Sequence, residues 1–469
     1  MEFHVSLAGR GDLSARIYRQ LHDAVIDGRL RAGEKLPPTR ELARRLAVSR
    51  NTVALAYERL TAEGFLVGRV GAGTFVCAEP PSAATPVTGR GAAPPAPVWR
   101  ALAAPPPRAG VPPPHDFGVG VPDTGRFPMA AWRRHVTRGL RDLAAADALY
   151  GDPAGHPALR AEIARHIGLS RSVRVPAEQV LVTNGTQQAL DLVARVLLAP
   201  GDRVAVEEPG YAPARELFAS HGAAVTGVPV DADGLVVTAL PDDARLVYTT
   251  PSHQFPLGPP MSLSRRTALL EWARQTGAVV IEDDYDSEFR FADRPLEPLH
   301  SLDRGDRVLY VGSFSKTMLP MLRLGFLVAP PSLLPALRSA KRLTDLQSET
   351  TTQAAMAGFM ADGLFVRHLR RSTREYAARR ALILAVLARD FADRLEVVPS
   401  TAGLHLAAWP RGEVDVAALV ARAAAAGVGI ADLADYHGFG AGRPGVALGY
   451  GRIAVERIED GLRLLGEVW

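Results

Sequence analysis

The chain is poor in lysine, and one of its lysines lies beside two hydroxyl side chains. Of the 54 basic residues only three are lysines, namely Lys35, Lys316 and Lys341. Arginine thus serves almost wherever a positive charge suffices, but its guanidinium stays protonated and is a poor nucleophile. A lysine amine can lose its proton and attack a carbonyl carbon. Lys316 ends a Ser-Phe-Ser-Lys run that includes Ser313 and Ser315, and it is therefore the candidate for covalent amine chemistry.

An acidic run follows a short apolar segment that is predicted to be a buried strand. Val279–Ile281 precedes the sequence Glu-Asp-Asp-Tyr at positions 282–285. An anionic aspartate such as Asp283 can keep a heterocyclic nitrogen protonated, and Tyr285 can donate a hydrogen bond to a ring hydroxylate. An amine and a ring-binding carboxylate are what pyridoxal 5'-phosphate (PLP) requires, so we predict PLP as the cofactor.

The phosphate of such a cofactor needs donors, and two segments supply them. Gly185, Thr186 and Gln187 lie between a predicted strand and a predicted helix, where free backbone N–H groups and the helix dipole favour an anion. Arg323 follows Lys316 by seven residues and adds a guanidinium. Both segments are therefore predicted to bind phosphate.

The elements that must hold these groups follow the pattern of an α/β fold. From about His115 onward, short runs of valine, leucine and isoleucine alternate with longer amphipathic segments. This alternation predicts a mostly parallel sheet covered by helices. The predicted strands are Val180–Thr183, Val204–Val206, Leu246–Tyr248, Val279–Glu282, Val308–Val311 and Leu324–Ala329.

Residues 1–77 have a different pattern, that of a winged helix-turn-helix. The predicted helices are Ser14–Gly28, Thr39–Leu46 and Arg50–Glu63. Two short runs, 64–67 and 73–76, are separated by a glycine-containing turn and predict a β-hairpin, the wing. Residues 1–76 hold twelve Lys/Arg and eight Asp/Glu, so this zone carries the whole formal net charge of +4. That asymmetry favours nucleic acid as the partner of this end.

The composition of the chain narrows the class of protein further. Residues 78–114 are rich in proline and alanine and predict a semi-rigid, extended linker. The chain has no apolar run long enough to span a membrane and no secretory signal, so we expect a cytoplasmic protein. The one cysteine, Cys77, cannot form an intrachain disulfide. No metal is predicted, because neither His253 nor His405 has a neighbouring histidine or carboxylate at metal-type spacing.

Lys35–Val76 resembles the DNA-binding domain of GntR-type regulators over its whole length. The segment reads KLPPTRELARRLAVSRNTVALAYERLTAEGFLVGRVGAGTFV. The resemblance implies binding to double-stranded operator DNA, and polar groups at a helix N-terminus together with arginines suit phosphates and base edges. The implied DNA-binding residues are Arg40, Ser49, Arg50, Asn51, Thr52, Arg69 and Gly71.

Residues 115–469 resemble the fold-type I aminotransferases, whose mostly parallel sheet is followed by a small C-terminal α/β subdomain. By this resemblance Lys316 is the lysine that forms a Schiff base with PLP, and Asp283 pairs with the pyridine nitrogen. Tyr211 is similar to the aromatic residue that stacks on the ring. Tyr150 is similar to a tyrosine that reaches a phosphate across a dimer interface, so a homodimer is implied. The other implied PLP-binding residues are Gly185, Thr186, Gln187, Tyr285, Ser313, Ser315 and Arg323.

The whole chain resembles the MocR/GabR subfamily of GntR-type regulators, including the segments TPSHQFPLG and EDDYDSEFR. The resemblance implies that PLP forms an aldimine with Lys316, that a small amino compound exchanges with the lysine, and that DNA binding by the dimer changes. We therefore predict a transcriptional regulator with little turnover. The alternative is an aminotransferase with an accessory DNA-binding domain. A degenerate dimerisation scaffold is disfavoured, because Lys316 persists in a lysine-poor chain.

Two positions depart from the aminotransferase pattern. Phe255 begins Phe-Pro-Leu-Gly where many aminotransferases have Asn-Pro-x-Gly, which removes an amide contact to the ring. Ala447 stands where those enzymes usually place an arginine for the substrate's α-carboxylate, and Arg443 or Arg452 could substitute. If neither does, the expected effector is PLP itself or an amine without a carboxylate.

Overall fold

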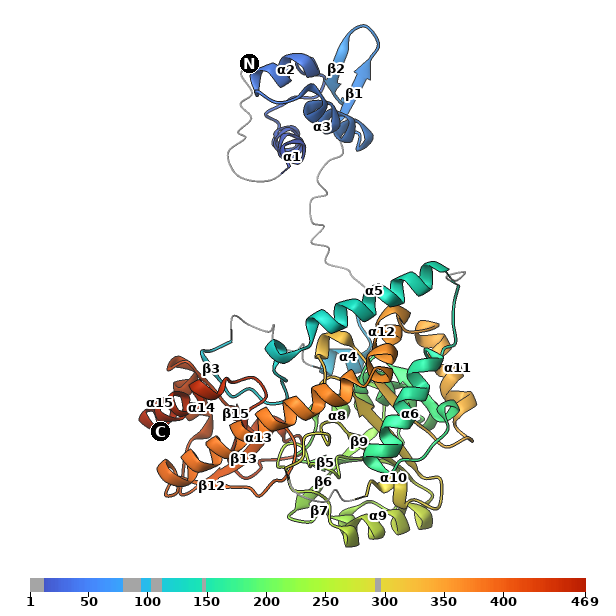
Figure 1. Ribbon diagram of the computed structural model, residues 1–469, viewed down its shortest axis with the longest axis vertical. Coiled ribbons are helices and arrows are strands. Elements are labelled where there is room, and N and C mark those ends of the chain that lie inside the picture. The colour runs from blue at the N-terminus through green and yellow to red at the C-terminus, as the bar shows by residue number, and fades with distance from the viewer. Residues whose placement is uncertain (1–11, 79–93, 103–111, 146–148, 292–296) are drawn as a thin grey trace. The chain divides into compact units, whose positions relative to one another are not determined.

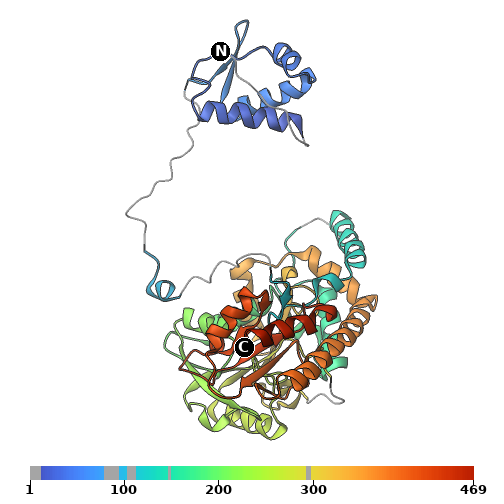
Figure 2. The same ribbon diagram turned by 90° about the vertical axis from the view of Figure 1, so that its left-hand side faces the viewer.

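The computed structural model describes residues 12–78, 94–102, 112–145, 149–291 and 297–469. The chain divides into two compact units, Met1–Pro94 and Pro95–Trp469, each with its own hydrophobic core (Figures 1 and 2). Among the described residues, no helix combines the length and the apolar character needed to cross a bilayer.

The N-terminal unit is a winged helix-turn-helix, as predicted. Its elements are α1 (Leu13–Ile26), α2 (Thr39–Arg45), α3 (Arg50–Ala62), β1 (Leu66–Arg69) and β2 (Gly73–Val76). Ile17 and Leu21 of α1 share one buried core with Val53 and Leu60 of α3. The two strands pair antiparallel, and Gly71 between them has a φ of 73°, a conformation that glycine adopts without strain.

The second unit is built on an eight-stranded sheet. In spatial order its strands are β4 (Val180–Thr183), β11 (Gly325–Val328), β10 (Val308–Ser313), β9 (Val279–Asp284), β8 (Ala244–Thr249), β5 (Arg203–Glu208), β6 (Ala224–Asp231) and β7 (Gly234–Leu235). Strands β10, β9, β8, β5 and β6 run parallel, whereas β11 is antiparallel to both of its neighbours. The prediction of a mostly parallel sheet is confirmed.

Helices cover both faces of this sheet, because successive side chains on a strand point to opposite sides. Ile281 faces one core and Val280 the other. One face carries α7 (Thr186–Leu197), α8 (Ala212–Ser220) and α11 (Leu334–Asp345). The other carries α6 (Pro157–Arg171), α9 (Leu263–Thr276), α10 (Leu299–Leu302), α12 (Thr350–Ala361) and part of α13 (Leu364–Asp390). Helix α5 (Met129–Ala145) packs against α12.

A smaller C-terminal subdomain follows α13. Its sheet has the order β12 (Leu395–Val397), β13 (His405–Pro410), β16 (Val446–Gly449) and β15 (Ala431–Asp432). Helices α14 (Val416–Ala425) and α15 (Ile458–Glu467) accompany it, and β14 (Val428–Gly429) pairs in parallel with β3 (His115–Asp116). The described part of the range predicted to be an extended linker contains one short helix, α4 (Pro97–Ala101).

Candidate functional site

Most of the predicted cofactor residues line one cavity of about 280 Å³. The cavity lies at the carboxyl ends of parallel strands of the large sheet, the usual place for a ligand in an open α/β sheet. The predicted residues that line it are Thr186, Gln187, Tyr211, Asp283, Tyr285, Ser313, Ser315, Lys316 and Arg323. Two predicted residues are not in the lining: Gly185, which lies directly behind Arg323, and Tyr150, which is 81% exposed.

Lys316 lies three residues after the end of β10 and lines the cavity. Its Nζ donates a hydrogen bond of 2.6 Å to the carbonyl oxygen of Gly120. Gly120 has a φ of 74°, which favours glycine, and a Cβ atom there would lie 3.0 Å from this nitrogen. The amine is thus held by a backbone carbonyl that comes from the start of the second unit.

Asp283 is the one member of the acidic run on β9 that faces the cavity. Its Oδ2 accepts a hydrogen bond of 2.7 Å from the hydroxyl of Tyr248, whereas its buried Oδ1 has no partner among the described residues. Burial raises the pKa of the Asp283 carboxyl to about 7, and Lys316 opposes that rise. Its neighbours point elsewhere, since Asp284 binds Arg171 and Glu282 accepts hydrogen bonds from backbone N–H groups.

Tyr285 belongs to a buried polar cluster that sequence reasoning missed. Its hydroxyl oxygen lies 2.9 Å from Nδ1 of His253, and Oδ1 of Asp286 lies 3.1 Å from the same nitrogen. His405 lies against His253, with 4.8 Å between the ring centroids, and burial lowers its pKa to about 3. The prediction of no metal considered spacing along the sequence alone, whereas the fold brings His253, Asp286 and His405 together from distant segments.

These three side chains could in principle hold a metal ion, since their ligand atoms all lie within 4.8 Å of one another. His253 contacts Asp286 and Tyr285 through Nδ1, and His405 contacts the carbonyl of Pro256 through Nε2. Nε2 of His253 is buried without a hydrogen-bond partner among the described residues. The three side chains and Tyr285 thus form a buried polar cluster next to the cavity. The sequence placed Asp286 directly after Tyr285, but it gave no signal that His253 and His405 join them.

The predicted phosphate end of the cavity is formed by the start of α7 and by Arg323. Helix α7 begins at Thr186, and Gly185 before it has a φ of 78°. Arg323 donates a hydrogen bond of 2.7 Å from Nη2 to the carbonyl oxygen of Asn184. Ser313 Oγ accepts a hydrogen bond from the backbone N–H of Ser315. The helix N-terminus, the guanidinium and the hydroxyls together suit a phosphate.

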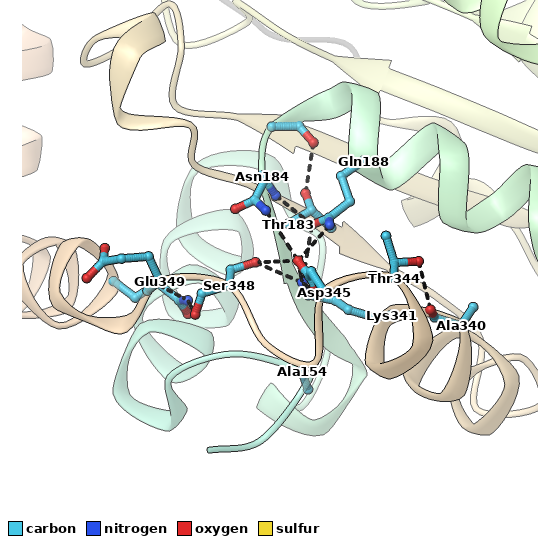
Figure 3. A network of polar contacts seen from close by, with 12 residues as sticks. Ala154, Thr183, Asn184, Gln188, Ala340, Lys341, Thr344, Asp345, Ser348 and Glu349 are labelled. Atoms are coloured by element: carbon cyan, nitrogen blue, oxygen red, sulfur yellow. Dashed lines mark hydrogen bonds and ion pairs between the residues drawn. The ribbon is translucent and has the colours of Figure 1, made fainter. Parts of the chain in front are cut away.

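A polar network next to the predicted phosphate end of the cavity holds Asn184 and Gln188 in place (Figure 3). Asn184 and Gln188 both donate to Oδ2 of Asp345 on α11. The fully buried Lys341 binds Asp345, Ser348 and Gln188 through its Nζ. Lys341 therefore has a structural role and does not line the cavity.

Aromatic side chains form the wall of the cavity beside the predicted ring position. Tyr211 meets the ring of Phe255 edge-on with 5.9 Å between centroids, and Phe255 also contacts Tyr285 and Tyr436. Burial raises the pKa of the Tyr211 hydroxyl to about 12. At Phe255 the departure from Asn-Pro-x-Gly thus replaces an amide side chain by an aromatic ring that contacts Tyr211, Tyr285 and Tyr436.

The arginines that were expected to compensate for Ala447 do not line the cavity among the described residues. Arg443 lies 3.5 Å from Glu396 and stacks over the ring of Trp409, and Arg452 lies 3.1 Å from Asp116. Ala447 itself is buried in a small apolar cluster. The described lining contains two cations, Lys316 and Arg323.

In the N-terminal unit, the predicted DNA-binding residues gather at α2, the start of α3 and the wing. Ser49 caps α3 by accepting a hydrogen bond of 3.1 Å from the backbone N–H of Thr52. Arg69 stacks over the ring of Phe75 in the wing. The exposed members of the set are Arg40, Ser49, Arg50, Asn51, Arg69 and Gly71, and Thr52 is half-buried.

Comparison with known proteins identifies both units. Residues 13–76 match the family of bacterial regulatory proteins called the gntR family, and residues 113–455 match aminotransferase class I and II. The α-aminoadipate aminotransferase LysN of Thermus thermophilus has a similar structure, with a TM-score of 0.69 and 31% identity over 75% of this chain and 91% of that one.

Relatives that span nearly the whole chain are themselves regulators. The probable rhizopine catabolism regulatory protein MocR of Rhizobium meliloti is 38% identical, over 96% of this chain and 92% of that protein. The pyridoxine biosynthesis transcriptional regulator PdxR of Corynebacterium glutamicum is 32% identical, over 97% of this chain and 95% of that protein. This chain therefore belongs to the MocR-type transcriptional regulators, in which a GntR winged helix-turn-helix is joined to an aminotransferase class I and II domain.

Proposed function

We propose that this regulator binds PLP covalently through Lys316 and reports a small amino compound to its DNA-binding unit. The observation that carries the proposal is that Lys316 and Asp283 line the same cavity as a phosphate-binding set of donors. When bound, PLP supplies an aldehyde with which a lysine or an effector amine can react. Under this proposal the cavity is where the effector acts, and operator DNA is bound through the exposed set on α2, α3 and the wing.

The residues of the cavity suit PLP at each of its polar groups. The unpartnered Oδ1 of Asp283 would accept from a protonated pyridine nitrogen, which would offset the burial that raises the pKa of this carboxyl. Thr186, Gln187 and Arg323 can hold the phosphate at the N-terminus of α7. Tyr211 can cover the ring.

The amine of Lys316 must release a proton before it can react. In the structure the Nζ donates to the carbonyl of Gly120, which holds the amine at one wall of the cavity. Tyr285 provides a hydroxyl at another wall. The Gly120 carbonyl and the Tyr285 hydroxyl thus orient the amine and hold protons, while the cofactor supplies the carbon atom that reacts.

We further propose a homodimer, with Tyr150 contributing to the phosphate end of its partner's cavity. The exposure of Tyr150 in the single chain supports this assignment. The effector is proposed to lack a carboxylate, and to be either a simple amine or PLP itself. The two cations of the described lining support this, because Arg323 is already assigned to the phosphate.

The visible absorption spectrum of the protein with PLP tests the proposal. We expect a band of covalently linked PLP that borohydride fixes to the chain, and mass spectrometry should place the adduct on Lys316. Lys316→Ala should lose the band and Lys35→Arg, which removes a lysine from the other unit, should retain it. If wild type shows no adduct, or if Lys316→Ala retains it, the proposal is wrong.

An aminotransferase with an accessory DNA-binding unit is the competing function, and the presence of Lys316, Asp283, Tyr285 and Arg323 in one cavity supports it. Multiple-turnover assays with amines and 2-oxo acids discriminate between the two. Turnover in the range usual for enzymes, about 1 per second or more, would favour the enzyme. A change in DNA affinity on adding PLP and an amine, with little turnover, would favour the regulator.

A further inference from the structure

A second cavity in the aminotransferase-like unit is larger than the first, at about 890 Å³. It lies between α6, α13 and the segment that follows β9. A volume of this size is within the range of small-molecule binding sites. Its polar lining is dominated by arginines, namely Arg165, Arg171, Arg290, Arg370 and Arg374, and it also includes His166.

Four polar side-chain atoms in this lining are buried without a hydrogen-bond partner among the described residues. They are the guanidinium donors Nη1 of Arg171 and Nη2 of Arg290, the ring nitrogen Nε2 of His166, and Oε2 of Glu288. Arg171 is only 6% exposed. Buried polar atoms are almost always paired, and an unpaired one in a cavity points to a ligand.

The charges of the lining give the sign of that ligand. Glu288 is the one carboxylate among the described lining residues, and it lies 3.9 Å from His166. Burial, and next the positive charge of Arg171, lower the pKa of Arg290 to about 10, while Asp284 and Asp286 oppose that shift. Five arginines face this one lining carboxylate, so the lining carries more positive than negative charge. Phe291, Met360 and Leu369 add an apolar surface. A ligand with an anionic head group and an apolar body matches both the positive charge and the apolar surface of this lining.

We propose that this cavity binds a small organic oxyanion, a carboxylate or a phosphate ester, and that Arg171 links it to the cofactor cavity. Arg171 and Arg290 would bind the anionic head, and Arg370 and Arg374 of α13 would add positive charge at the wall. Guanidinium groups are the side chains best suited to such heads, because their planar N–H groups match two oxygens at once.

Arg171 is positioned to pass on the effect of binding. Its Nε donates a hydrogen bond of 2.7 Å to Asp284, and its Nη2 donates one of 2.6 Å to Ser252. Asp284 directly follows Asp283, and Ser252 directly precedes His253. A ligand that moves this guanidinium therefore acts on both segments that line or support the cofactor cavity. This coupling, unlike the binding itself, rests on the proposed function.

Calorimetric titration of the full-length protein with benzoate and with phenyl phosphate tests the binding, with benzyl alcohol as the neutral analogue. We expect at least one of the anions to bind and the alcohol not to bind. The anion that binds more tightly identifies the head group. No anion binding, or equal binding of the alcohol, would overturn the proposal.

Two variants locate the binding. Arg290→Gln removes a charge and should weaken anion binding at least tenfold, and Val366→Trp should reduce it by filling the cavity from its partly exposed wall without altering an arginine. Arg274→Gln, on the exposed surface of α9, should bind as wild type. Thermal melting without ligand checks that each variant folds. Unchanged affinity in folded Arg290→Gln and Val366→Trp would place the anion elsewhere and contradict the proposal.

The coupling has its own readout. In protein loaded with PLP, saturation with the anion should shift the absorption spectrum of the cofactor, and Arg290→Gln should lose that shift at the same anion concentration. Binding without any spectral change would overturn the coupling. Lys316→Ala should still bind the anion in calorimetry, so failure of the PLP proposal and failure of this one give different results.

Discussion

The hydroxyl oxygen of Tyr285 and Nδ1 of His253 lie 2.9 Å apart, and this contact determines what the tyrosine can do. The same nitrogen lies 3.1 Å from the carboxylate of Asp286, which can only accept a hydrogen bond when ionised. Nδ1 must then carry the proton and can share it with the tyrosine oxygen. The hydroxyl proton of Tyr285 consequently remains available to the cavity.

Loss of the His253 ring should alter the pH dependence of the bound cofactor. In His253→Ala the hydroxyl oxygen of Tyr285 no longer accepts a hydrogen bond from the histidine, so the hydrogen bond that the hydroxyl itself donates is weaker. The deprotonated ring hydroxyl of a cofactor in the cavity is then less stabilised. We expect the pKa of the cofactor chromophore to rise by about half to one unit. Absorbance titration measures it. Tyr285→Phe should give an equal or larger rise, and a fall in either variant would contradict the assignment.

Asp283→Asn should separate cofactor affinity from stability. The pKa of Asp283 is raised to about 7 in the folded state, so between about pH 4 and 7 the folded chain retains a proton that the unfolded chain has lost. The contribution of this group to the free energy of unfolding therefore falls as the pH rises through that window. The asparagine variant should lack this component, and without cofactor at pH 8 it should be about 1–2 kcal/mol more stable than wild type.

The same variant should bind PLP at least tenfold more weakly, because an amide does not hold a pyridine nitrogen protonated. Urea denaturation of the cofactor-free protein at several pH values and a PLP titration measure the two effects. Tighter PLP binding by the variant would refute the role of this carboxylate.

Lys341→Met should destabilise the second unit. The substitution keeps the length of the side chain but leaves Asp345 without the amine 2.8 Å away, behind Asn184. We expect a loss of about 2–4 kcal/mol in urea denaturation, together with weaker PLP binding. Lys35→Arg is the control for both measurements. A loss below about 0.5 kcal/mol would show that the network adds little.

Arg50→Ala should weaken binding to duplex DNA of any sequence. Arg50 is exposed at the N-terminus of α3, where its guanidinium can reach a phosphate. The slope of log affinity against log salt should become smaller by about one for each phosphate that the variant no longer neutralises. Fluorescence anisotropy at several salt concentrations measures the slope. Arg274→Ala in the other unit should leave it unchanged, and an unchanged slope in Arg50→Ala would exclude an interaction of this arginine with phosphate.

Sequence patterns were sufficient for the parts of the fold that have a local period. The valine-rich strands at Val180–Thr183 and Val308–Val311, the helix at Arg50 and the wing were all predicted, because burial on both faces or on one face leaves a trace in neighbouring residues. The site residues 313–316 could be found for a similar reason, since they form one short segment.

Contacts between distant segments could not be predicted in this way. His253 and Asp286 are on different loops, and metal-type spacing within one segment says nothing about them. The positions of the Arg443 and Arg452 side chains also depend on tertiary partners, Glu396 and Asp116. No local sequence pattern indicates these partners. The arginine-lined cavity was missed because arginine is abundant throughout this chain, so none of its members stood out.

The hydrogen bond from Lys316 Nζ to the Gly120 carbonyl joins the proposed cofactor-binding amine to a segment near the start of the second unit. An ammonium group has three protons to donate, whereas a nitrogen joined by a double bond to carbon has at most one. Under the proposed function, covalent use of Lys316 would therefore compete with its hydrogen bond to the Gly120 carbonyl. Gly120 lies shortly after Pro114, where the predicted linker ends, so that reaction would remove a hydrogen bond from the segment that follows the linker.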